Sequence, residues 1–229
     1  MSAPLSTRLP NKNVYNFTLR CLFFQILALI CISFILLTND SAVNIISNCL
    51  LACELTITYF VTSCVSFSVY LPQGNTSITT TTFVKVKNGL KGCGLYIISI
   101  LVFHCIAVLY GAPFFESVAE TFHFAMVMTS TAVLPPLCAL GINFSSWIRV
   151  FAQNKPELGP ESVVQIVTIL SILGAWLGAF PIPLDWDRPW QIWPITCVLG
   201  SILGHIVGLF CGAIHLMYSY RKLKKFKIT

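Results

Sequence analysis

The chain has 229 residues, of which 56% are hydrophobic and only 10% are charged, and its mean hydropathy is +0.80. A soluble domain needs roughly a quarter of its residues charged to cover its surface, so this composition excludes a soluble globular protein and indicates an integral membrane protein. The net charge of +6 does not indicate nucleic-acid binding, because the basic residues lie beside apolar runs, where they are typical of membrane topology.

Six apolar segments are long enough to cross a bilayer as helices, which takes roughly 17 to 25 mostly apolar residues. They are residues 21–37, 45–71, 92–110, 117–141, 163–180 and 195–218. The connections between them are short and leave no room for a soluble domain. The sequence therefore predicts one all-α membrane domain over residues 1–229, a bundle of about six transmembrane helices.

Basic residues predict the orientation of this bundle. All lysines and arginines except Arg188 fall in the two termini or in the loops that follow the second and fourth spans. The positive-inside rule then places both termini in the cytosol and residues 180–194 on the lumenal or exterior side. Lys225 and Lys227 also have the K-x-K-x-x spacing of a retrieval signal to the endoplasmic reticulum, although a basic tail after a last span is common.

Acidic and histidine side chains gather near the lumenal end of the fourth span. Glu116, Glu120 and His123 are spaced i, i+4, i+7 and are predicted to share one helical face, which His104 on the third span can approach. Placing a charged side chain inside a membrane helix costs roughly 2.5 to 3.5 kcal/mol, so the position of these residues requires an explanation. Three stay open: acids in the polar interface favoured by the helix dipole, contacts to a partner or lipid headgroup, and metal binding or catalysis.

The stretch FPIPLDWDRPWQIWP, residues 180–194, connects the last two spans. Its tryptophans suit the membrane interface and its prolines stiffen a turn. The arginine can pair with a neighbouring aspartate or with a phosphate. A structural hairpin and a lipid-phosphate or partner contact are both favoured over catalysis. The candidate contact residues are Asp185, Trp186, Asp187, Arg188, Trp190 and Trp193.

Glycines recur at every fourth residue in the last two spans. Small residues at this spacing let membrane helices approach closely, which predicts either a tight pair that holds the hairpin or a face offered to another subunit. No nucleotide-binding loop, zinc-protease motif or nucleophile elbow occurs, and no catalytic residue, metal or cofactor is predicted. The candidate packing glycines are Gly174, Gly178, Gly200, Gly204, Gly208 and Gly212.

Three stretches carry a family resemblance: LYGAPFFESVAETF, WIRVF and GAWLGAFPIPLDWDRPWQIWPITCVLG. Over about residues 90–220 the chain resembles the phosphatidylinositol-glycan biosynthesis class F (PIG-F) family. The resemblance implies a multi-pass protein of the endoplasmic reticulum membrane that takes part in glycosylphosphatidylinositol (GPI) anchor assembly. It implies a non-catalytic subunit that stabilises the ethanolamine phosphate transferases of classes O and G. Those enzymes transfer phosphoethanolamine from phosphatidylethanolamine to GPI mannoses on the lumenal side.

Site roles within that expectation come from the residues alone. Glu116 and Glu120 are expected to favour the donor's ammonium, and Arg188 with its neighbouring tryptophans is expected near the phosphate. Two other classes of function remain alternatives. One is a flippase or carrier for phosphatidylethanolamine or a GPI intermediate. The other is a metal-dependent enzyme that uses Glu116, Glu120, His123 and Asp185.

Overall fold

The computed structural model describes residues 12, 14–16, 18–20, 22, 23, 25, 26, 82–184, 186 and 188–226. Within this part of the chain the structure is helical and contains no strand. The predicted span 45–71 and most of the span 21–37 lie outside the described residues, as does Lys227. The six-span count and the cytosolic position of both termini therefore stay predictions.

The four later predicted spans are confirmed as helices long and apolar enough to cross a membrane. They correspond to Gly89–Leu109, Val118–Leu140, Pro160–Gly178 and Ile195–Lys224. The first lies in α4 (Thr82–Leu109). The second is built from α5 (Val118–Met128), the π-helical turn η2 (Thr129–Val133) and α6 (Leu134–Leu140). The third and fourth correspond to α8 (Pro160–Gly178) and α9 (Ile195–Phe226), and α9 includes the backbone of Lys225.

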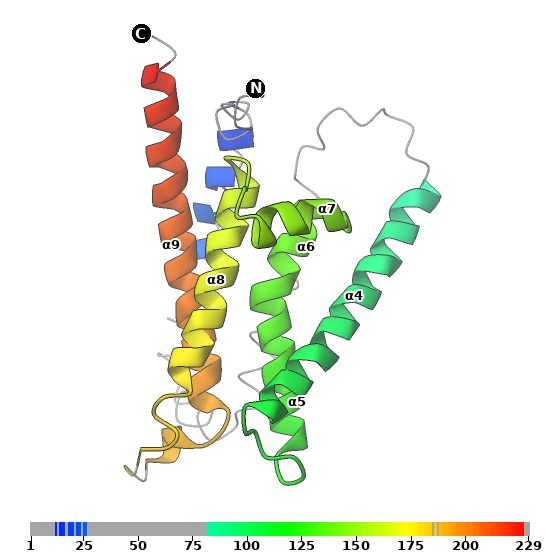
Figure 1. Cartoon of the computed structure of the whole chain (residues 1–229), viewed down its shortest axis with the longest axis vertical. Helices are drawn as coiled ribbons and strands as arrows, with labels where there is room; N and C mark the ends of the chain where they lie inside the picture. The colour runs from blue at the N-terminus through cyan, green and yellow to red at the C-terminus, as the bar shows by residue number, and fades with distance from the viewer. Residues whose placement is uncertain are drawn as a thin grey trace.

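Helices α8 and α9 run side by side along the bundle (Figure 1) and touch through their glycines. A Cβ atom built on Gly174 would collide with the backbone of Gly200, and one built on Gly204 would collide with the carbonyl of Leu170. Further along, a Cβ on Gly208 would lie 2.8 Å from the Cα of Val167. Only glycine fits these positions, so the fourfold spacing seen in the sequence joins two helices of the same chain.

Two apolar clusters hold the bundle, one toward each end. The first joins Phe124 and Met128 of α5 to Ala175 of α8 and Val198 of α9. The second joins Val163 and Val167 of α8 to Leu209 and Leu216 of α9, and Leu22 of the amino-terminal segment packs into it. The first cluster includes Ala112 of the α4–α5 connection, and Trp193 of the α8–α9 connection packs against it, so it helps to place both connections.

Among the described helices, α4 stands apart from the others. In Figure 1 it meets α5 at one end and leans away from the bundle at the other. Only 11% of its span is buried inside the protein, against 56% for the span through α5, η2 and α6. Tyr96 ties its middle to the bundle through a 2.7 Å hydrogen bond between its hydroxyl and Ser130 Oγ.

At the other end, two short elements lead into α8. They are α7 (Phe144–Trp147), capped by the Asn143 side chain, and the π-helical turn η3 (Ile148–Ala152). The guanidinium of Arg149 donates to Glu161 Oε1 at 2.7 Å, and Gln165 donates to the carbonyl of Val150 at 2.7 Å. The hydrogen bond to Glu161 raises the pKa of Arg149 although burial opposes it. This connection is therefore pinned to the first turns of α8.

Candidate functional site

The connection between α8 and α9 is folded around one glutamine. Gln191 lies in the short 3₁₀ turn η4 (Pro189–Gln191) and is buried. Its amide nitrogen donates to the carbonyl of Pro181 at 2.6 Å and to that of Leu184. Its oxygen accepts from the backbone N–H of Arg188 at 3.1 Å. One side chain thus hydrogen-bonds three backbone groups of the connection, and the carbonyls of Pro181 and Leu184 also accept from backbone N–H groups in turns, so the connection has a defined shape.

The same connection is fastened to α5 by Trp193, which lies two residues before α9. The indole nitrogen of Trp193 donates to Thr121 Oγ1 at 3.0 Å. Its ring meets Phe124 edge-on, with centroids 5.2 Å apart. Such an aromatic pair adds roughly 0.5 to 1.5 kcal/mol to the area that it buries. The α4–α5 and α8–α9 connections consequently form one surface at one end of the bundle (Figure 1).

This surface exposes large apolar side chains from both connections. In the α4–α5 connection Tyr110 is 81% exposed and Phe115 is 86% exposed. In the α8–α9 connection Trp186 is 54% exposed and packs edge-on against Trp190, with ring centroids 6.0 Å apart. Aromatic residues held on a rigid frame are enriched both at protein interfaces and at the membrane–water boundary.

The acidic and histidine residues do not form the single helical face that their spacing predicts. Because α5 begins at Val118, Glu116 lies in the preceding connection and is exposed, whereas Glu120 is half-buried in the first turn. Nδ1 of His123 bonds the carbonyl of Ala119 at 2.7 Å. Among the described residues no three His, Cys, Asp or Glu side chains come together as a metal site.

His104 faces α5 but meets an aromatic ring there rather than an acid. Its imidazole packs edge-on against Phe122, with ring centroids 6.3 Å apart. Its Nδ1 is buried and has no hydrogen-bond partner among the described residues. His104 therefore belongs to the α4–α5 contact.

Arg188 is exposed on the α8–α9 connection, and no acid pairs with it in the part of the chain that the structure describes. Asp185 and Asp187, its predicted partners, lie outside the described residues. The predicted pairing of Arg188 with an aspartate or a phosphate stays a prediction.

A buried polar cluster in the middle of the bundle was not anticipated from the sequence. It lies between the two apolar clusters along α8 and α9. Thr131 Oγ1 and Ser201 Oγ are 3.0 Å apart, and Ser171 Oγ and His205 Nδ1 are 3.2 Å apart. Its members are Thr131 of η2, Thr168 and Ser171 of α8, and Ser201 and His205 of α9.

Two consecutive prolines account for this cluster. Pro135 and Pro136 have no N–H, so a helix cannot serve the carbonyls four residues earlier, those of Thr131 and Ala132. In hydrocarbon an unserved carbonyl costs several kcal/mol. Thr168 Oγ1 donates to the carbonyl of Ala132 at 3.1 Å, and the imidazole of His205 hydrogen-bonds the backbone of Thr131. The two consecutive prolines are the sequence signal that this span has carbonyls without helical donors. They do not identify Thr168 and His205 as the side chains that donate instead.

A family model for the GPI biosynthesis protein family Pig-F matches residues 21–213. The chain is 48% identical over 139 residues to a mouse protein named "GPI ethanolamine phosphate transferase, stabilizing subunit", and 46% identical to the human protein of that name. Each match covers 61% of this chain and 64% of the relative. A relative from Yarrowia lipolytica, "Glycosylphosphatidylinositol anchor biosynthesis protein 11", is 41% identical over 50% of this chain and 49% of its own length. No solved structure matches.

Proposed function

Because the chain belongs to the Pig-F family of GPI biosynthesis proteins, we propose that it is the stabilising, non-catalytic subunit of ethanolamine phosphate transferases of classes O and G. It works in the membrane of the endoplasmic reticulum. There it assists the transfer of phosphoethanolamine from phosphatidylethanolamine to GPI mannoses. The observation that carries the proposal is the name of the mouse and human relatives, each given as a stabilizing subunit of that transferase.

The rigid surface at the α4–α5 and α8–α9 end supports a binding role. Tryptophan, tyrosine and arginine supply most of the binding energy at protein interfaces. Gln191 and the Trp193–Thr121 hydrogen bond hold these connections in place before any partner arrives, which lowers the entropy lost on binding. Trp186, Trp190 and Arg188 contact the transferase or the phosphate of its lipid donor, and Glu116 and Glu120 favour the donor's ammonium.

The test separates assembly from transfer. Trp186→Ala combined with Trp190→Ala is expected to lower the yield of co-purified transferase in mild detergent. Trp176→Ala is the matched control, because Trp176 is 56% exposed on α8 within the membrane span rather than on the connections. Equal transferase yields from the double variant and the control would contradict this surface as the contact.

A second arm tests the acids. Glu116→Gln combined with Glu120→Gln is expected to leave the yield of the complex intact and to reduce phosphoethanolamine transfer by it. Unchanged yield together with unchanged transfer would exclude a role of these acids toward the lipid donor. Movement of phosphatidylethanolamine across vesicles by the purified protein alone would instead favour a flippase and contradict the stabilising role.

A further inference from the structure

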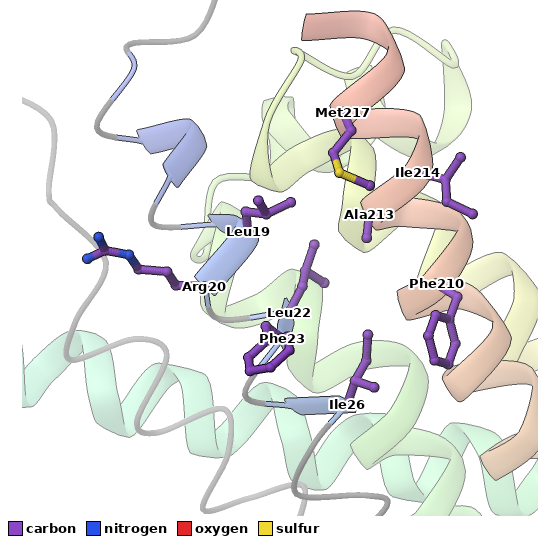
Figure 2. A pocket seen from close by; sticks show the side chains of 9 residues that line it. All are labelled: Leu19, Arg20, Leu22, Phe23, Ile26, Phe210, Ala213, Ile214 and Met217. Carbon is purple, nitrogen blue, oxygen red and sulfur yellow. The ribbon is translucent and has the colours of Figure 1, made fainter. Parts of the chain in front are cut away.

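An apolar groove lies at the end of the bundle that carries the basic residues, far from the surface proposed for the transferase. It separates the amino-terminal segment from α9 and has a volume of about 780 Å³. Figure 2 shows Leu22 and Phe23 on one side and Phe210, Ile214 and Met217 of α9 on the other. The α9 residues follow the i, i+4, i+7 spacing of a single helical face.

The two walls of the groove are fixed, so the space between them does not close by collapse. Beyond Met217, the rings of Tyr15 and Tyr220 stack with centroids 4.0 Å apart and fasten the amino-terminal segment to α9. Leu22 is buried in the cluster formed by α8 and α9, whereas Phe23, the next residue, is 65% exposed. Leu22 thus contributes to both the cluster and the groove, whereas Phe23 lines the groove from an exposed position.

The depth and chemistry of the groove define what fills it. Its α9 wall lies within the span Ile195–Lys224, and all of its lining residues except Arg20 are apolar. Water needs several polar partners to occupy a cavity, and this lining does not supply them. The volume lies in the range of about 300–1,000 Å³ that is usual for small-molecule sites. At this depth in a bilayer the surrounding medium is acyl chain, which matches the lining.

Charge at the mouth selects the headgroup. Arg20 is one of the lining residues, and in Figure 2 its side chain extends away from α9, out of the groove. Arg221, Lys222 and Lys224 are exposed on α9 just beyond the groove. Basic side chains at a membrane surface attract anionic lipids by roughly 1 kcal/mol each, and an arginine grips a phosphate through two parallel hydrogen bonds.

We propose that this groove binds one acyl chain of an anionic glycerophospholipid, with the lipid phosphate at Arg20. The positive-inside distribution predicts that this lipid comes from the cytosolic leaflet. The site is independent of the transferase contact, because it lies at the opposite end of the bundle and shares no residue with it.

The test uses the full chain reconstituted in phospholipid nanodiscs. Phosphatidylserine and phosphatidylcholine, each with a photoactivatable group on one acyl chain, serve as probes. The crosslinked peptides are then mapped by mass spectrometry. We expect crosslinks to concentrate on the peptides of Phe23, Phe210 and Ile214 and to favour phosphatidylserine. Crosslinks spread evenly over the lipid-facing side chains of α4, α8 and α9 would overturn the proposal.

Two variants distinguish the chain site from the headgroup site. Ala213→Phe fills the groove and is expected to remove the concentrated crosslinks, whereas Ile106→Phe on the exposed face of α4 leaves them unchanged. Arg20→Gln is expected to lower the preference for phosphatidylserine about five-fold, the factor that fits one basic side chain at an anionic surface. Lys91→Gln on α4 is its control and keeps the preference. Equal labelling by both lipids in the unmodified chain would overturn the headgroup assignment even if Ala213→Phe disturbs folding.

Discussion

Trp193 and Thr121 lie 72 positions apart in the sequence, yet the indole N–H of Trp193 donates to Thr121 Oγ1 at 3.0 Å. Thr121 is fully buried and also donates from Oγ1 to the carbonyl of Ser117 at 2.8 Å. One hydroxyl therefore connects the start of α5 with the α8–α9 connection, and it sets how the two connections are placed relative to each other.

We expect Trp193→Phe to destabilise the protein by at least about 1 kcal/mol, because the smaller phenyl ring fills less of the space of the indole, the hydrogen bond is lost and the Thr121 hydroxyl oxygen is left without that donor. Thermal unfolding in detergent micelles measures the loss. Thr121→Val removes the same hydrogen bond, so the double variant should cost less than the sum of the two single changes. Additive losses would show that the two side chains do not interact.

The glycine contact between α8 and α9 predicts a large difference between substitutions that add the same methyl group. Gly200→Ala is expected to cost about 1 to 3 kcal/mol, because the Cβ would collide with the backbone of Gly174 and the helices must separate. Gly92→Ala on α4 meets no atom within 4 Å and is the matched control. It should be neutral or stabilise α4 by up to about 1 kcal/mol. Equal melting temperatures for the two variants would contradict the close approach.

The carbonyl that Pro136 leaves without a helical donor predicts a rescue. Thr168→Val should destabilise the protein by about 1 kcal/mol, because the carbonyl of Ala132 loses its donor. In a Pro136→Ala background an N–H returns four residues after Ala132, so the same Thr168→Val change should cost clearly less. Chemical denaturation of all four proteins completes the cycle. An equal loss of stability in both backgrounds would show that the contribution of Thr168 does not depend on Pro136.

The ion pairs of Arg149 predict unequal roles for two neighbouring acids. Glu161 Oε1 is 2.7 Å from the guanidinium and its side chain is 19% exposed, whereas Glu157 Oε1 is 3.6 Å away and 58% exposed. Glu161→Gln should therefore lower the melting temperature more than Glu157→Gln. The Arg149–Glu157 pair is exposed, and an exposed ion pair contributes little to stability. The reverse order would contradict the geometry.

Arg149 also predicts how this connection responds to pH. Its pKa is raised in the folded protein by the hydrogen bond to Glu161. A raised pKa contributes stability at every pH below the unfolded value and loses it only as the pH rises through the folded value, which for an arginine is far above neutral. The destabilisation caused by Arg149→Gln should thus be the same at about pH 7 and about pH 9. A smaller effect at the higher pH would show that another group carries the dependence.

Hydropathy predicted the four spans of the described region because a membrane leaves the backbone few ways to satisfy its polar groups. The spacing of the glycines also predicted a close helix contact, since small residues at every fourth position let helices approach, and the structure shows the first of its two predicted forms, a tight α8–α9 pair. Hydropathy and glycine spacing are both local features of the sequence, so they can be recognised without knowledge of the fold.

The acidic face was predicted incorrectly because the start of a helix depends on the connection before it. Gly111 adopts a φ of 102°, a conformation that favours glycine, and Pro113 follows it. The chain therefore turns between α4 and α5, and Glu116 precedes the helix that was expected to carry it. The donors Thr168 and His205 were missed for a different reason. They serve carbonyls 36 and more positions away, a relationship that no periodicity records.

The polar cluster has a consequence for the order in which the protein is made. The carbonyls of Thr131 and Ala132 are synthesised before either of their donors, and His205 lies in the last helix of the chain. Until the ribosome has delivered α8 and α9, the nascent protein carries two backbone acceptors that its own sequence has not yet satisfied. The hydrogen bonding of these two carbonyls is thus completed only when α9 has packed against the rest of the bundle.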